Sequence, residues 1–76
     1  MRILLIEDGP VVAETVTLCF GVRWPATHVL HAQLGEDGVK MVRSENPDIV
    51  ILDLGLPDID GFDVCAQIRS SSEVPI

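Results

Sequence analysis

The chain has 76 residues, of which 12 are acidic and 5 are basic, so its formal net charge is −7. This length allows one small domain with a thin margin of stability, and a hydrophobic content of 47% excludes a disordered or purely charged segment. The acidic excess argues against binding of nucleic acid or of an anionic membrane by this segment, because both need a basic surface. No apolar run is long enough for a signal peptide or a membrane span, so we expect a cytoplasmic location.

The first half of the chain alternates a short apolar run with a segment of helical periodicity. Ile3–Ile6 is a continuous apolar run, which is typical of a strand covered on both faces. A helix is expected from Pro10 to Gly21. Its apolar stripe, which we expect to face the core, consists of Val12, Val16, Cys19 and Phe20. Thr27–Ala32 is rich in residues that favour β-structure and predicts a second strand.

The middle of the chain repeats this alternation. Gly35–Ser44 predicts a short second helix, which Asn46 and Pro47 end because the residue before a proline disfavours helical backbone. Ile49–Leu52 is the strongest strand signal, since all four residues are β-branched or aliphatic. It ends in a carboxylate, as the first strand does.

The last third predicts one more helix and the start of a further strand. Asp60 is placed to cap the helix. The apolar stripe of this helix consists of Val64, Cys65 and Ile68. Val74–Ile76 is interpreted as a fourth strand that has just begun. The alternation of strands and helices predicts an α/β fold with a parallel sheet and right-handed crossovers.

Carboxylates follow two of the predicted strands directly. Glu7 and Asp8 come after the first strand and Asp53 comes after the third. In an open parallel sheet of order 2-1-3 these strand ends are neighbours, and the functional crevice lies beyond them. Three carboxylates this close repel one another unless a proton or a cation intervenes, and carboxylate oxygens suit Mg2+. The alternative is that each acidic residue only ends a strand and begins a turn.

Two segments together resemble the receiver domain of two-component response regulators. They are residues 3–10 (ILLIEDGP) and residues 47–61 (PDIVILDLGLPDIDG). The resemblance covers the whole chain and implies a flavodoxin-like (CheY-like) doubly wound parallel sheet, truncated at the start of the fourth strand. Residues 1–76 would then be one incomplete receiver domain, and the family's switch Ser or Thr and its later Lys lie outside this sequence.

The resemblance implies a role for each matching residue. Asp53 matches the aspartate that accepts a phosphoryl group from a sensor histidine kinase. The implied Mg2+ ligands are Glu7, Asp8, Asp53 and the backbone carbonyl of Gly55. Pro57 and Gly61 match the residues that shape the loop after the acceptor. By analogy with the family, an output domain or effector, often one that binds DNA, would act downstream.

Two other functions are compatible with parts of this pattern. A Mg2+-dependent phosphohydrolase that forms an aspartyl phosphate also places an aspartate after an aliphatic strand, but the haloacid dehalogenase pattern needs a second aspartate where Gly55 stands. A receiver-like module that binds partners without phosphorylation is the other alternative, and the complete set of Glu7, Asp8 and Asp53 argues against it.

Two further features carry expectations of their own. Turn chemistry and the dipole at the start of the third helix explain the acidic residues Asp58, Asp60 and Asp63, although such a run could also recruit a basic partner. Because a fourth strand has only begun, the edge of the strand Ile49–Leu52 is expected to be open. An open apolar edge favours self-association.

Overall fold

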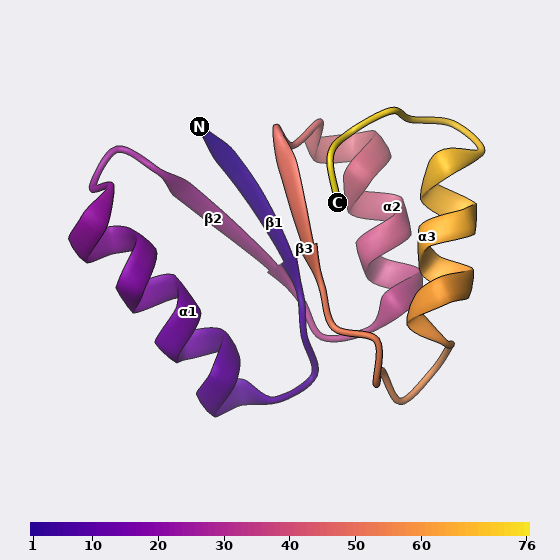
Figure 1. Cartoon of the computed structure of the whole chain (residues 1–76), viewed down its shortest axis with the longest axis horizontal. Coiled ribbons are helices and arrows are strands. Elements are labelled where there is room, and N and C mark those ends of the chain that lie inside the picture. The colour runs from indigo at the N-terminus through magenta and orange to yellow at the C-terminus, as the bar shows by residue number, and fades with distance from the viewer.

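The computed structural model describes residues 1–76 and shows an α/β fold in which strands and helices alternate. The elements in chain order are β1 (Arg2–Ile6), α1 (Pro10–Arg23), β2 (His28–Ala32), α2 (Gly35–Glu45), β3 (Ile49–Leu52) and α3 (Gly61–Arg69). All strands are parallel in the order β2-β1-β3, which confirms the predicted fold class. Helix α1 lies on one side of the sheet, and α2 and α3 lie side by side on the other (Figure 1). No helix combines the length and the apolar character that a membrane span requires.

The central strand β1 is covered on both faces. Ile3 and Leu5 point to one face and Leu4 and Ile6 to the other, and each of the four is at most 2% exposed. The continuous apolar run predicted this arrangement, because a strand that alternated polar and apolar residues would have one face in water.

The main core lies between the sheet and the two helices α2 and α3. It consists of Leu4, Ile6, Ala32, Val39, Val42, Val50, Val64 and Ile68. Helix α2 approaches β1 closely at Gly38, where the Cβ of any other residue would collide with the side chain of Ile6. This close contact holds the amino-terminal half of α2 against the end of β1 from which the acidic residues project.

Helix α1 departs from the prediction in both its face and its length. Val12 is 52% exposed and Cys19 is also exposed, whereas Ala13 is the buried residue. The stripe prediction was wrong for these two residues, whereas its other members, Val16 and Phe20, are partly buried. Apolar residues occur on nearly all sides of this helix, so their spacing selects no single face. The helix also continues past Gly21 and ends at Arg23.

The ends of the other two helices agree with the sequence. Helix α2 stops at Asn46, whose φ of 48° places it in the left-handed region that ends helices. At the start of α3, the Oδ1 of Asp60 accepts a hydrogen bond of 2.7 Å from the backbone N–H of Phe62. Residue type predicts the end of α2 at Asn46 and the cap at Asp60, but not the left-handed conformation of Asn46.

The C-terminal residues run beside β3 without forming a regular strand. The backbone N–H of Val50 donates a hydrogen bond of 2.8 Å to the carbonyl of Pro75, so the segment Val74–Ile76 covers the first part of the edge of β3. In Figure 1 this segment is the yellow chain end next to β3. The remainder of that edge has no neighbouring strand.

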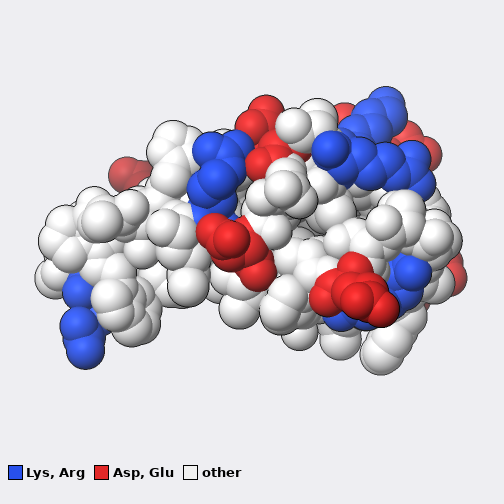
Figure 2. Space-filling view, turned by 90° about the horizontal axis from the view of Figure 1, so that it is seen from above, with Lys and Arg blue, Asp and Glu red and all other residues white.

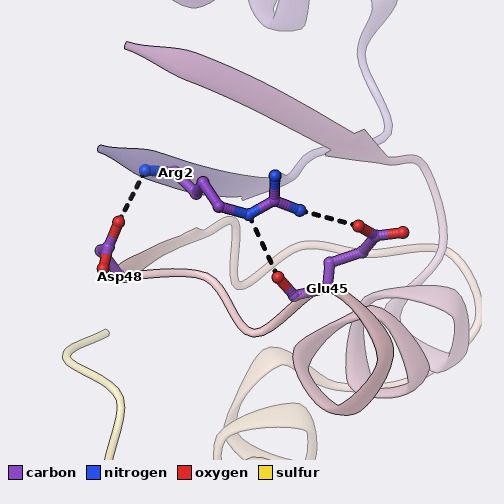
Figure 3. Close-up of polar contacts among 3 residues, drawn as sticks. All are labelled: Arg2, Glu45 and Asp48. Atoms are coloured by element: carbon purple, nitrogen blue, oxygen red, sulfur yellow. Dashed lines mark hydrogen bonds and ion pairs between the residues drawn. The ribbon is translucent and has the colours of Figure 1, made fainter.

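At the end of the sheet where the strands begin, basic and acidic side chains lie next to one another (Figure 2). Arg2 connects three elements there (Figure 3). Its guanidinium donates to the carboxylate of Glu45 at 2.7 Å and to the carbonyl of the same residue at 3.2 Å, and its backbone N–H donates to Asp48 at 2.7 Å. These contacts tie the start of β1 to the end of α2 and to the residue before β3.

Candidate functional site

The three predicted acidic residues meet at the opposite end of the sheet, where the strands finish. Parallel pairing places Ile6 of β1 beside Leu52 of β3, so the residues that follow each strand emerge together. Glu7, Asp8 and Asp53 each offer one carboxylate oxygen, and these atoms all lie within 4.8 Å of one another. All three residues are partly buried. The expectation that they come together is therefore confirmed.

Backbone and side-chain contacts position Glu7. Its N–H donates to the carbonyl of Ala32 at 3.0 Å, which continues the pairing of β1 with β2 by one residue. Its Oε1 accepts a hydrogen bond of 3.0 Å from the N–H of Gly9. The Nε2 of His31 lies 2.8 Å from its carbonyl oxygen, an interaction that the sequence analysis did not anticipate.

Asp53 is held in the same manner on the other side of the site. Its N–H donates to the carbonyl of Ile6 at 2.9 Å, which extends the pairing of β3 with β1. Its Oδ1 accepts a hydrogen bond of 3.1 Å from the N–H of Gly55. This hydrogen bond places the N–H of Gly55 directly beside the carboxylate of Asp53.

The chemistry of this donor set suits a hard divalent cation. Three like charges within 4.8 Å repel one another, and a cation between them removes that repulsion. Carboxylate oxygens are the ligands that Mg2+ takes in proteins, usually one or two of them with water completing the octahedron. Glu7, Asp8 and Asp53 therefore fit a Mg2+ ion.

Asp58 has a position that the sequence analysis missed. Its Oδ1 accepts a hydrogen bond of 2.8 Å from the N–H of Gly35, and its Oδ2 accepts one of 3.0 Å from the N–H of Glu36. These two hydrogen bonds hold the pKa of the Asp58 carboxyl below its usual value, and the bond from Glu36 has the larger effect. Asp58 therefore caps α2, whereas its place in the run of acidic residues predicts turn chemistry and a position at the start of α3. Asp60 does cap α3, and Asp63 lies exposed on that helix.

One signal for this cap was available in the sequence. Helix α2 begins after Leu34, a residue with no side-chain oxygen, and the first helical N–H groups need acceptors. Because the residue before this helix cannot accept those hydrogen bonds with its side chain, we expect an acceptor from elsewhere in the chain. The pattern alone does not say which of the twelve acidic residues supplies it.

The loop after Asp53 closes tightly at Gly61. The N–H of Gly61 donates to the carbonyl of Leu54 at 3.2 Å. A Cβ at position 61 would lie 2.5 Å from the Cα of Leu54, so the two backbones approach too closely for any side chain. Pro57 is exposed in the same loop. The close approach gives a physical reason for a glycine at position 61.

Curated relatives match nearly the whole chain. The transcriptional regulatory protein AfsQ1 of Streptomyces coelicolor is 40% identical over 74 residues, which are 97% of this chain and 32% of that protein. The DNA-binding response regulator MtrA of Mycolicibacterium smegmatis is 40% identical over 75 residues, which are 99% of this chain and 32% of that protein. The chain thus spans about a third of the length of these relatives.

Solved structures and a family comparison agree with this result. The BeF3-activated N-terminal receiver domain of Klebsiella pneumoniae RstA is 27% identical with a TM-score of 0.88, over 96% of this chain and 61% of that one. A LuxR-family two-component response regulator from Aurantimonas is 31% identical with a TM-score of 0.86, over 97% of this chain and 53% of that one. The model of the response regulator receiver domain matches residues 3–76. With the acidic cluster at the ends of β1 and β3, these matches show that the chain belongs to the response regulator receiver domain family.

Proposed function

We propose that this chain accepts a phosphoryl group on Asp53 in a Mg2+-dependent reaction and thereby controls a downstream output. The observation that carries the proposal is the convergence of Glu7, Asp8 and Asp53 within 4.8 Å at the ends of two neighbouring strands. Membership of the receiver family supports it, because receivers are signalling modules and not enzymes that turn over an external substrate.

The proposed step is a transfer between two side chains. One oxygen of the Asp53 carboxylate forms a bond to phosphorus while the bond from phosphorus to a nitrogen of the donor histidine breaks. The imidazole leaves with the electron pair of that bond. A carboxylate needs no base to activate it, so positioning and charge stabilisation supply the catalysis. Mg2+, when bound, neutralises charge on the phosphoryl oxygens.

Glu7 and Asp8 would hold the metal, and Gly55 would contribute its backbone carbonyl. The carboxylate of Asp8 accepts no hydrogen bond from the protein, so its oxygens are available to a cation, whereas Glu7 is oriented by the N–H of Gly9. Pro57 and Gly61 are proposed to shape the loop that keeps Gly55 beside Asp53.

The proposed partners follow from the relatives. Two of them are described as a transcriptional regulatory protein and a DNA-binding response regulator. A sensor histidine kinase as phosphoryl donor, and an output function that acts on DNA in the complete protein, are therefore part of the proposal. So is a location in the cytoplasm, where such a kinase presents its phosphorylated histidine.

Incubation of the protein with Mg2+ and acetyl phosphate tests the proposal. Intact mass spectrometry is expected to show one added phosphoryl group on the wild type and none on Asp53→Asn. Asp63→Asn is the matched control, because it removes the same charge from an exposed aspartate outside the site, and it should be labelled like the wild type.

Two results would decide against phosphoacceptance at this site. An unlabelled wild type, or an adduct that persists in Asp53→Asn, would exclude Asp53 as the acceptor. Steady release of inorganic phosphate over many turnovers would instead support the Mg2+-dependent phosphohydrolase. A wild type that stays unlabelled but still binds a partner would support the module that acts without phosphorylation.

A further inference from the structure

The first N–H groups of helix α2 donate hydrogen bonds to a side chain from a distant part of the chain. Its own N-cap residue, Leu34, has no side-chain oxygen, and the two oxygens of Asp58 each take one of the first helical N–H groups. Accepting hydrogen bonds on both oxygens, at 2.8 and 3.0 Å, favours the ionised carboxylate, because the hydroxyl oxygen of a protonated one is a weaker acceptor.

The residue after Asp58 also contacts the start of α2. A Cβ on Gly35 would lie 2.7 Å from the Cγ1 of Ile59, so this loop and the first turn of the helix are packed as closely as a glycine allows. The loop is therefore attached to α2 twice, by hydrogen bonds through Asp58 and by packing through Ile59. Both attachments depend on the loop keeping one conformation.

The same loop carries the proposed chemistry. It begins at Asp53 and Gly55, whose side chain and N–H are joined at 3.1 Å, and Asp58 lies only three residues beyond Gly55. At its far end the loop closes through the N–H of Gly61 and the carbonyl of Leu54. Between these two contacts, the hydrogen bonds of Asp58 connect the loop to helix α2.

We propose that Asp58 is a positioning residue that links the loop of residues 53–61, which carries the proposed phosphoacceptor, to the start of α2. By binding Gly35 and Glu36 it holds the loop in the conformation in which Asp53 and Gly55 take Mg2+. This inference rests on the proposed function, because it concerns the same metal site. It implies that the start of α2 responds to metal binding at that site, and that the Asp58 carboxylate transmits this response.

The link must act in both directions, because coupling between two events is reciprocal. If Asp58 bound to α2 favours the loop conformation that binds metal, then bound metal must favour the bonds from Asp58 to α2. The N–H groups of Gly35 and Glu36 should therefore exchange with solvent more slowly when Mg2+ is present.

Mg2+ affinity, measured by isothermal titration calorimetry, is the first test. Asp58→Ala is expected to raise the Kd by up to about tenfold, because removing a direct contact to a metal ligand costs at least that much and Asp58 acts only through the loop. Asp58→Asn keeps one acceptor oxygen and should lie between Asp58→Ala and the wild type. Asp63→Asn loses the same charge without the link, so it should bind like the wild type and separates positioning from general electrostatics.

Amide exchange on the wild type is the second test, and it does not depend on any variant folding. Mg2+ should slow exchange at Gly35 and Glu36 while leaving Asp63 unchanged. Absence of that protection, or equal Mg2+ affinities in folded Asp58 variants and the wild type, would overturn the link alone. A wild type that binds no Mg2+ would overturn the link together with the metal site of the proposed function.

Discussion

The imidazole of His31 donates to the backbone carbonyl of Glu7. The Nε2 atom lies 2.8 Å from that oxygen, and a carbonyl only accepts hydrogen bonds, so this nitrogen carries the proton. The bond joins the side chain of an exposed β2 residue to the first residue of the acidic cluster. It therefore braces the end of β1 from the side opposite β3.

His31→Ala is expected to lower the free energy of unfolding by about 0.5–1.5 kcal/mol, the usual net contribution of one hydrogen bond. Urea denaturation measures the change. His28→Ala is the matched control, since His28 is exposed on the same strand and makes no such bond. Equal effects of the two substitutions would show that the contact to Glu7 does not stabilise the fold.

Asp8→Asn is expected to stabilise the protein in EDTA and to weaken its response to Mg2+. Removing one of three clustered charges relieves two pair repulsions, each of about 1 kcal/mol at this separation in a solvated site. The wild type should gain about 2.7 kcal/mol when Mg2+ reaches 100 times its Kd, and the variant should gain less. Asp8→Asn should therefore be the more stable protein in EDTA, and the wild type the more stable one in Mg2+. A variant less stable than wild type in EDTA would contradict the repulsion.

The contribution of Asp58 to stability is expected to depend on pH. Hydrogen bonds from Glu36 and Gly35 lower its pKa in the folded state, so over the interval between the two pKa values the unfolded chain binds more protons than the folded one. The stabilisation is complete above the ordinary aspartate pKa of about 3.9 and is lost as the pH falls through the lowered value. Urea unfolding of wild type and Asp58→Asn should show a larger difference at neutral pH than in strong acid. A difference that does not change with pH would contradict this assignment.

Gly61→Ala and Gly21→Ala are expected to have opposite effects. The new Cβ at position 61 would lie 2.5 Å from the Cα of Leu54, and such overpacking costs about 1–3 kcal/mol. Position 21 lies within α1 with no atom inside 4 Å of a new Cβ, so alanine there should stabilise the helix by about 0.5–1 kcal/mol. Thermal unfolding of both variants measures the contrast, and a neutral Gly61→Ala would mean that the loop relaxes freely.

A peptide of residues 1–76 alone is expected to self-associate at raised concentration through the partly open edge of β3. Pro75 covers the edge at Val50, but no strand lies beyond it, and unpaired strand edges recruit other chains. Sedimentation velocity should show a larger species growing with concentration. A monomer that unfolds cooperatively at every concentration tested would refute the prediction.

Much of this fold follows from local patterns. The apolar run Ile3–Ile6 predicted a strand buried on both faces, because residue type alone determines that pattern. The meeting of Glu7 and Asp53 was predictable too, since the ends of adjacent parallel strands share one edge. These inferences need only neighbours in sequence and a known strand order.

Other features depend on contacts that local patterns do not contain. Helix α1 buries Ala13 and exposes Val12, and a helix that is apolar all round gives no signal for its inner face. The cap from Asp58 to Gly35 spans 23 residues. The bond from His31 to Glu7 uses a backbone carbonyl, which every residue has, so residue type could not single it out.

The position of β1 has a consequence for how the molecule opens. This strand has a neighbour on each edge and is buried on both faces, so it is the last segment to lose its structure when the periphery frays. Glu7 and Asp8 extend directly from it. The acidic cluster therefore rests on the most persistent part of the fold, and partial opening of α1 or of the C-terminal segment leaves that half of the cluster in place.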